Sequence, residues 1–258
     1  MKADAPARAG RRRRTERARP SAFWILALVI LPVISTVTRL RIVDGHKLPP
    51  HGACIIVPNH VSELDPVIVG VGVWRLGRLP RFLAKGSLFR VPIVGWLLRR
   101  SGQIPVERAA VSRQGSPLDA ARLVAERGNA VIVYPEGTLT RDPDLWPMRG
   151  KTGAARMALR YGLPVIPVAH WGVQDVLGRY SHRVRLFPPR RIRIVFGDPV
   201  DLEAFRGRPI DATTLAEATE AIMVAITGLV ARLRGTTPPT GRWDPAAHDQ
   251  KETGRFEA

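Results

Sequence analysis

Two short motifs in this sequence carry residue types that can move a proton and bind an oxyanion. The first runs from Asn59 to Pro66 and places His60 five residues before Asp65. The second is Tyr134-Pro135-Glu136-Gly137-Thr138, which follows an apolar run. A carboxylate bonded to one imidazole nitrogen leaves the other nitrogen free as a base, and a backbone corner can supply N–H groups to an oxyanion. An acyl transfer requires these parts.

The two residues of the first motif can meet only if His60 lies outside the regular part of a helix. Residues five apart on an α-helix are separated by about 140° around its axis. Pro66 suits the first turn of a helix with Asp65 as its cap, while Ser62 and Asp65 can instead form a capping box. Both registers leave His60 in the turn before the helix. Taken alone, the motif also fits a surface histidine beside a helix cap, and the second motif fits an ordinary turn.

The segments that must position these motifs alternate between short apolar runs and helical stretches from residue 39 onward. We expect strands at 53–57, 81–85, 103–106, 130–134, 165–170 and 191–196, and helices at 66–76, 88–100, 116–127, 152–161 and 211–234. Since 191–196 alternates arginine with apolar residues, it is expected to be a half-exposed edge strand. The alternation predicts a single α/β domain with a mostly parallel or mixed central sheet flanked by helices. Both motifs follow strands, so we expect them to share one crevice at the carboxyl ends.

Charge and hydropathy divide the chain into four parts. Residues 1–20 are strongly basic and are predicted to be a disordered arm, whereas residues 21–38 carry no charge. A domain is expected over 39–234 and a disordered tail over 235–258. The net charge of +18 over 258 residues favours anionic partners such as phospholipid headgroups, nucleic acid or an acidic carrier protein.

The uncharged segment 21–38 is predicted to be a membrane-inserting helix. Its helical length of roughly 27 Å is slightly short of a ~30 Å hydrocarbon core, so it can span a bilayer or enter one leaflet only. A signal peptide is the third alternative, but no A-x-A-like cleavage site follows. Either membrane arrangement places the basic arm against anionic headgroups on the cytoplasmic side. The single cysteine, Cys54, excludes an intrachain disulfide and a cysteine-based zinc site.

Four blocks in a fixed order make the chain resemble the glycerolipid acyltransferases of the 1-acylglycerol-3-phosphate (lysophosphatidic acid) acyltransferase type. The matching blocks are His60-x4-Asp65, residues 102–108 ending in Arg108, residues 134–138, and residues 165–168 with their central proline. The resemblance extends from about residue 40 to residue 200 and includes the stretch 84–96.

The resemblance implies a mechanism without an enzyme nucleophile. His60 is the expected general base, which takes the proton from a lysophospholipid hydroxyl as that hydroxyl attacks an acyl thioester, and Asp65 orients it. Arg108 is expected to bind the acceptor phosphate, and Lys85 is a second candidate for that contact. His170, at the end of a strand, is a weaker site candidate.

Glu136, Gly137 and Thr138 are expected to shape the acceptor site. Leu139 stands where many family members have arginine. The missing phosphate contact is therefore expected from other basic residues, or the acceptor is a different lysolipid. The candidates for that contact are Arg141, Arg149 and Lys151.

The activity implied by the resemblance is the acylation of lysophosphatidic acid to phosphatidic acid in phospholipid biosynthesis, at the cell membrane. The expected co-substrate is acyl-CoA or an acylated acyl carrier protein, with no cofactor, no metal and no nucleic-acid partner. Helix 88–100 can border the acyl-chain groove or simply pack on the core. Two alternatives remain: an acyltransferase for another lysophospholipid or a glycolipid, and a non-catalytic basic protein that binds membranes or nucleic acid.

Overall fold

The computed structural model describes residue 16 and residues 23–106 and 117–251. Arg108, most of the basic arm and the last seven residues, 252–258, lie outside the described residues.

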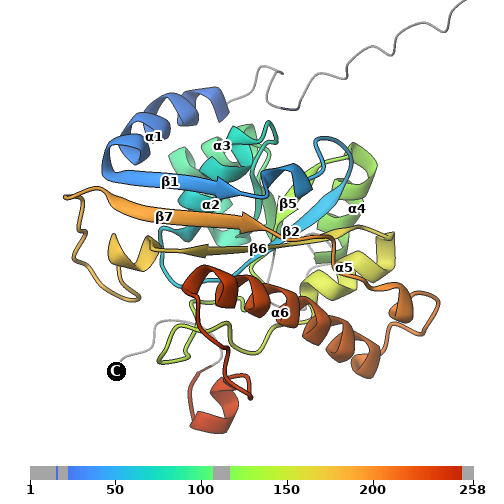
Figure 1. Cartoon of the computed structure of the whole chain (residues 1–258). Coiled ribbons are helices and arrows are strands. Elements are labelled where there is room, and N and C mark those ends of the chain that lie inside the picture. Colours follow the sequence, from blue (N-terminus) through green and yellow to red (C-terminus); the bar gives the residue numbers. More distant parts are fainter. Residues whose placement is uncertain (1–15, 17–22, 107–116, 252–258) are drawn as a thin grey trace, which may run out of the picture.

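Seven strands form one mixed sheet in the order β1-β7-β6-β2-β5-β3-β4 (Figure 1). The strands are β1 (Thr38–Val43), β2 (Cys54–Pro58), β3 (Arg81–Lys85), β4 (Ile104–Val106), β5 (Ala130–Ile132), β6 (Val165–Trp171) and β7 (Arg190–Phe196). All neighbouring strands are parallel except β6 and β7, which are antiparallel. The predicted α/β fold with a mixed central sheet is therefore confirmed.

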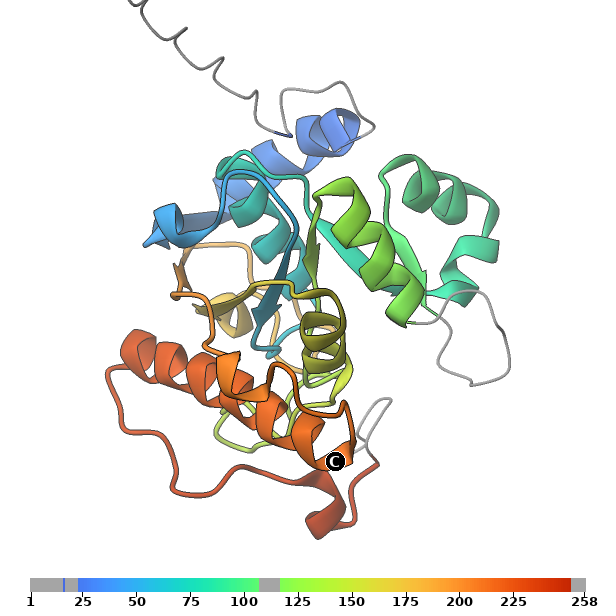
Figure 2. The ribbon, with the colours of Figure 1, turned by 90° about the vertical axis from the view of Figure 1, so that its right-hand side faces the viewer.

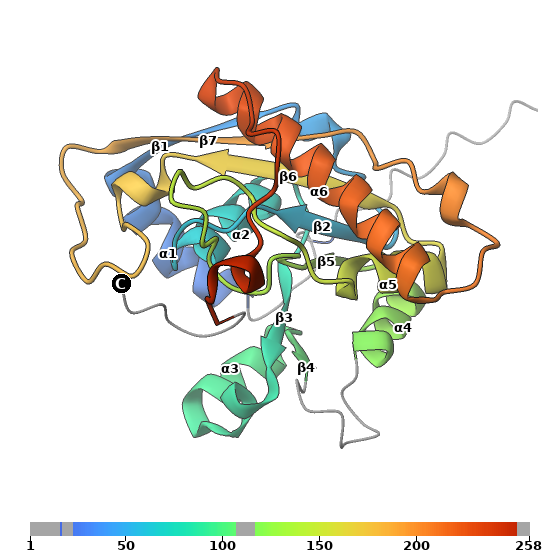
Figure 3. The ribbon, with the colours of Figure 1, turned by 90° about the horizontal axis from the view of Figure 1, so that it is seen from below.

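Helices cover both faces of the sheet, as the buried strand patterns require. The helices are α1 (Phe23–Val37), α2 (Asp65–Arg75), α3 (Pro92–Arg100), α4 (Pro117–Arg127), α5 (Gly153–Tyr161) and α6 (Ala212–Arg234). On β2, Cys54 and Ile56 pack toward α1 and α2, whereas Ile55 and Val57 pack toward α4, α5 and α6. Figures 2 and 3 show α3 standing apart, at the β3–β4 end of the sheet. It begins at Pro92, so the predicted helix 88–100 is divided into a 3₁₀ turn, η3 (Gly86–Arg90), and α3.

The prediction that 191–196 is an edge strand is wrong. Strand β7 lies inside the sheet because β1 covers its outer side along the whole of Thr38–Val43. The exposed arginines of β7 reflect a solvent-facing side of the sheet rather than an unpaired edge, since Arg191 and Arg193 are exposed while Ile192 and Ile194 are fully buried.

The C-terminal tail is ordered as far as the structure describes it, contrary to the predicted disorder over 235–258. Polar contacts, rather than a hydrophobic core, attach the tail to the domain. Arg242 forms an ion pair with Glu220 of α6 at 2.7 Å, and the carbonyl of Trp243 accepts the Arg149 N–H at 2.9 Å. A short 3₁₀ turn, η6 (Pro245–His248), follows.

The described helix that is long and apolar enough to cross a membrane is α6, not the N-terminal segment predicted from the sequence. It packs against the sheet and buries Leu215, Ala218 and Ile222, as a core helix does. The N-terminal segment does form a helix, α1, of 15 residues. One side of α1 is buried at Phe23 and Ile34, and its other side exposes apolar residues, namely Trp24, Leu28 and Val33.

Candidate active site

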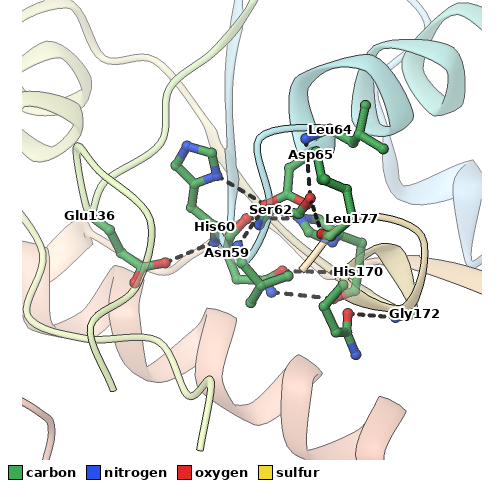
Figure 4. A network of polar contacts seen from close by, with 11 residues as sticks. Asn59, His60, Ser62, Leu64, Asp65, Glu136, His170, Gly172 and Leu177 are labelled. Atoms are coloured by element: carbon green, nitrogen blue, oxygen red, sulfur yellow. Dashed lines mark hydrogen bonds and ion pairs between the residues drawn. The ribbon is translucent and has the colours of Figure 1, made fainter. Parts of the chain in front are cut away.

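His60 and Asp65 lie within hydrogen-bond distance, as their spacing predicted. Nδ1 of His60 is 3.0 Å from Oδ2 of Asp65 (Figure 4). His60 occupies the turn after β2, and Asp65 is the first residue of α2. The same Oδ2 accepts the N–H groups of Val61 and Ser62 at 2.6 and 2.8 Å, so the turn closes around the carboxylate. The aspartate is fully buried, and 16% of the His60 side chain is exposed. The His60 ring is therefore reachable from solvent, while the carboxylate that it contacts is held in place by the turn.

A second histidine lies on the other side of Asp65. Nε2 of His170, in β6, is 3.6 Å from the Asp65 Oδ2 and 2.9 Å from the carbonyl oxygen of Asn59. The Asn59 side chain bonds in return, because its Oδ1 accepts the His170 N–H at 2.9 Å and its Nδ2 donates to the His170 carbonyl at 3.2 Å. These three bonds tie the end of β6 to the residue before His60 (Figure 4). From the sequence, a histidine at the end of a strand was only a weak indication of this role.

Burial disfavours the charged form of His170. Its side chain is fully buried, and burial lowers the pKa of His170 below its ordinary value of 6.5, although the Asp65 charge acts in the opposite direction. A neutral imidazole whose Nε2 carries the proton can donate to the Asn59 carbonyl oxygen and also face the aspartate.

Glu136 reaches the dyad through the backbone. It is 1% exposed, its Oε1 accepts the His60 N–H at 2.9 Å, and its Oε2 accepts the Met148 N–H at 3.1 Å. Burial raises the pKa of Glu136 to about 8, against the two N–H donors, which favour the charged form. The Thr140 N–H also donates to the His60 carbonyl at 2.7 Å. The two motifs are thus in contact, and the Glu136 carboxyl group accepts the N–H of His60.

The rest of the second motif borders a small cavity. Gly137 has a φ of 71°, and a Cβ at this position would lie 3.1 Å from Cδ of Lys151. The left-handed backbone favours a glycine here, and a Cβ would in addition displace the Lys151 side chain by a few tenths of an ångström. The cavity, of about 230 Å³, is lined by Glu136, Met148, Arg149, Gly150, Lys151, Thr152, Asp244 and Pro245.

Three basic residues were candidates for the contact that Leu139 cannot make. Arg149 and Lys151 line the cavity, and Arg149 is paired with Asp244 at 3.0 Å. Arg141 is buried, with 4% of its surface exposed, and so is Leu139, with 6% exposed. The cavity therefore brings two of the three candidates together beside Gly137.

The two phosphate ligands suggested by the resemblance belong to β3 and β4. Lys85 is the last residue of β3 and pairs with Val106 of β4 in parallel register. Arg108 follows β4 by two residues and lies outside the described residues. Because β2, β5, β3 and β4 are parallel neighbours, their carboxyl ends share one edge of the sheet, the edge that carries the dyad.

An apolar cavity of about 190 Å³ lies against the helix that Asp65 begins. Pro66 and Val67, the residues after Asp65, form part of its wall. The remaining lining residues come from α1, α2, β3, the residue before β3 and the residue before β4, and they are Phe23, Ala27, Ile30, Leu31, Gly70, Val71, Trp74, Pro80, Phe82 and Gln103. Among the described residues, no group of three or more His, Cys, Asp or Glu side chains is placed to hold a metal ion.

Comparisons with known proteins point to one family. A family model described as Acyltransferase matches residues 39–171. A chloroplastic 1-acyl-sn-glycerol-3-phosphate acyltransferase of Brassica napus is 29% identical over 58% of this chain and 42% of its own length. An enzyme of the same type from Bacillus subtilis is 25% identical over 74% of this chain and 87% of its own. The chain thus spans about two fifths of the length of the chloroplastic relatives that it matches.

A solved structure shows the same fold. The crystal structure of the 1-acyl-sn-glycerophosphate (LPA) acyltransferase PlsC from Thermotoga maritima superimposes with a TM-score of 0.58 and covers 86% of each chain. The two sequences are 20% identical. This likeness concerns the arrangement of the strands and helices.

Proposed function

The chain belongs to the acyltransferase family whose model matches residues 39–171, and from this premise we propose that it acylates lysophosphatidic acid to phosphatidic acid. The observation that supports the proposal most directly is the bonded pair of His60 and Asp65, with an apolar cavity beginning at Pro66. A candidate base, together with an apolar cavity on the helix that its partner Asp65 begins, suits a substrate that carries a hydroxyl group and a fatty chain.

In the proposed reaction, Nε2 of His60 takes the proton of the acceptor hydroxyl as its oxygen attacks the thioester carbonyl. Asp65 stabilises the imidazolium that forms. The C–O bond of the new ester forms, the C–S bond breaks, and the proton passes from His60 to the departing thiolate. General-base assistance of this kind contributes about 10²–10⁴ in rate. The donor is acyl-CoA or an acylated acyl carrier protein. Both donors are negatively charged, so the positive net charge of the chain attracts either one.

The acceptor phosphate is proposed to bind along the edge of the sheet that carries the dyad. Arg108 and Lys85 are the ligands implied by the resemblance, and Lys151 is a further cation beside Gly137. Gly137 and Thr138 would form the backbone wall of the acceptor site. Glu136 would act through the backbone of His60, because both of its oxygens accept main-chain N–H groups.

Membrane association is proposed to involve α1. This helix exposes Trp24, Leu28 and Val33, while the side that carries Phe23 and Ala27 packs on the domain. We propose that this helix enters one leaflet of the bilayer. The basic arm before it would then lie at anionic headgroups on the cytoplasmic side.

The replacement His60→Ala tests the proposal. Purified full-length protein is assayed with both thioester donors and a panel of lysolipids with and without a phosphate monoester. We expect turnover to fall by at least about 10²-fold while circular dichroism stays unchanged. His46→Ala, at an exposed histidine, is the matched control and should retain full activity. Near-normal turnover in His60→Ala would contradict the proposal.

A different lysolipid acceptor is the second candidate. Leu139 favours it, because an apolar residue is buried where the family frequently carries an arginine. The same lysolipid panel separates the two candidates. Preference for acceptors without a phosphate monoester would identify the second.

A further inference from the structure

The connection between β6 and β7 exposes a segment in which arginine and apolar residues mix, Arg183-Val184-Arg185-Leu186-Phe187. We refer to it as the basic apolar loop. Its apolar side chains are 53%, 40% and 73% exposed at Val184, Leu186 and Phe187, and both arginines are exposed as well. Neither arginine forms an ion pair with a described carboxylate. Single exposed apolar residues are ordinary on protein surfaces, but three within four positions mark an interaction site.

The basic apolar loop is connected to the turn that holds the dyad. Val184 forms an antiparallel bridge with Leu177, and the Leu177 carbonyl accepts a hydrogen bond from Oγ of Ser62 at 2.7 Å (Figure 4). Ser62 lies between His60 and Asp65. One β-bridge and one hydrogen bond therefore connect the loop to the dyad turn. The loop lies at the end of the sheet where β6 ends and β7 begins (Figure 1).

A second contact ties the same connection to the other motif. The Arg179 Nη1 donates to the carbonyl oxygens of Thr140 and Asp142 at 2.6 and 2.8 Å. Thr140 in turn bonds the backbone of His60. The base of the connection is therefore fixed to both halves of the site, while its tip projects into solvent.

The positive surface continues from the basic apolar loop onto the sheet. Strands β1 and β7 pair Arg39 with Arg191 and Arg41 with Arg193, and all four residues are exposed. Like charges directly opposite one another destabilise a strand pair. Anions bound at this surface would offset the repulsion between the paired arginines.

We propose that the basic apolar loop docks on an anionic lipid bilayer. Phe187, Leu186 and Val184 enter the interface between headgroups and acyl chains, and Arg183 and Arg185 contact lipid phosphates. The loop mixes apolar and basic residues at one tip, and the bilayer interface offers acyl chains and charged headgroups within one side-chain length of each other. The two are therefore complementary. A protein partner would instead favour an apolar centre with a polar rim. The docking rests on the proposed function in one respect. If the chain acylates a lysolipid, that acceptor enters the site from the bilayer on which the loop docks.

A site-specific fluorescent label tests this docking. The chain has one natural cysteine, Cys54, which is fully buried and whose pKa burial raises to about 11, so a maleimide dye reacts at an introduced surface cysteine. We compare full-length Phe187→Cys with Val224→Cys, whose position is 57% exposed on α6. With equimolar phosphatidylcholine and phosphatidylglycerol vesicles, the emission at position 187 should shift to the blue, and the emission at 224 should not.

The arginines are tested by vesicle affinity. Arg185→Ala should weaken binding to the same vesicles about fivefold, the change expected for one basic residue near an anionic surface. Arg160→Ala, at an exposed arginine of α5, is the matched control and should change binding less than about twofold.

Two results would overturn the inference. In the first, the protein floats with vesicles while the label at 187 keeps its emission in water, so that another surface binds the bilayer. In the second, an acidic carrier protein or a second copy of the chain shifts the label and vesicles do not. A blue shift in a protein that transfers no acyl group to any lysolipid would leave the docking surface standing and refute the proposed function instead.

Discussion

Replacing Glu136 with glutamine separates two roles for this residue: contact with the acceptor and support of the base. Its two carboxylate oxygens accept the N–H groups of His60 and Met148 at 2.9 and 3.1 Å. Glutamine offers one acceptor oxygen and one donor NH₂ group. One of the two main-chain N–H groups in Glu136→Gln therefore loses its acceptor and faces a donor.

The size of the effect follows from burial. Because burial raises the pKa of Glu136 to about 8, its carboxyl group is protonated near neutral pH, and the expected cost is that of one buried N–H group without a partner, about 1–3 kcal/mol. We therefore expect Glu136→Gln to lower the free energy of unfolding by about 1–3 kcal/mol, or the midpoint of thermal unfolding by about 2–12 °C. The catalytic rate constant should fall with it, because the backbone of His60 is released. The KM for the lysolipid should not change, because Glu136 is 1% exposed.

Steady-state kinetics and urea unfolding measure both quantities on the same preparation. Glu126→Gln is the matched control, since Glu126 is an exposed residue of α4 whose pair with Arg122 is worth about 0.3–0.5 kcal/mol. A raised KM with an unchanged free energy of unfolding would refute the reasoning and show that Glu136 contacts the acceptor.

The pH dependence of stability gives an independent check on Glu136. Its pKa is about 8 in the folded protein and 4.5 as the ordinary value, so between these pH values the folded state keeps a proton that the unfolded state releases. The contribution of Glu136 to the free energy of unfolding is therefore fully present below about pH 4.5. It is lost as the pH rises toward about 8. The glutamine variant should lack this slope.

Three further changes test the surroundings of the dyad. Asp65→Asn should keep the turn, because an amide oxygen can accept its N–H groups, but should lower the rate in single-turnover assays by about 10²–10⁴; a smaller loss would show that the charge is not needed. Burial lowers the pKa of His170, so the wild type should lose stability as pH falls below 6.5, and urea unfolding of His170→Gln should lack that loss. Gly172→Ala should lower stability by more than about 2 kcal/mol, since φ is 101° and a Cβ would overlap the carbonyl oxygen of Arg191; an unchanged unfolding midpoint would contradict this.

Local sequence signals were sufficient for most of the elements and for the dyad. Strand β3 matches its predicted range of 81–85, and α6 begins one residue after the predicted start. The dyad could be predicted because a single turn joins its two residues, and the start of a helix at Asp65 fixes that turn. Apolar periodicity and capping residues act over a few positions, so they can be read without knowing the fold.

The order of the strands and the partners of buried polar groups were decided only by the tertiary structure. Strand β1 escaped prediction because its arginines follow an apolar helix directly, and without β1 the strand β7 was taken for an edge. The bonds between Asn59 and His170 link residues that are 111 positions apart, and the bond from the His60 N–H to Glu136 links residues that are 76 positions apart. No periodic pattern encodes such a pairing, because it depends on β2 lying between β5 and β6 in the sheet. The sequence by itself therefore determined which residues could do the chemistry, and the folded sheet decided which groups hold them.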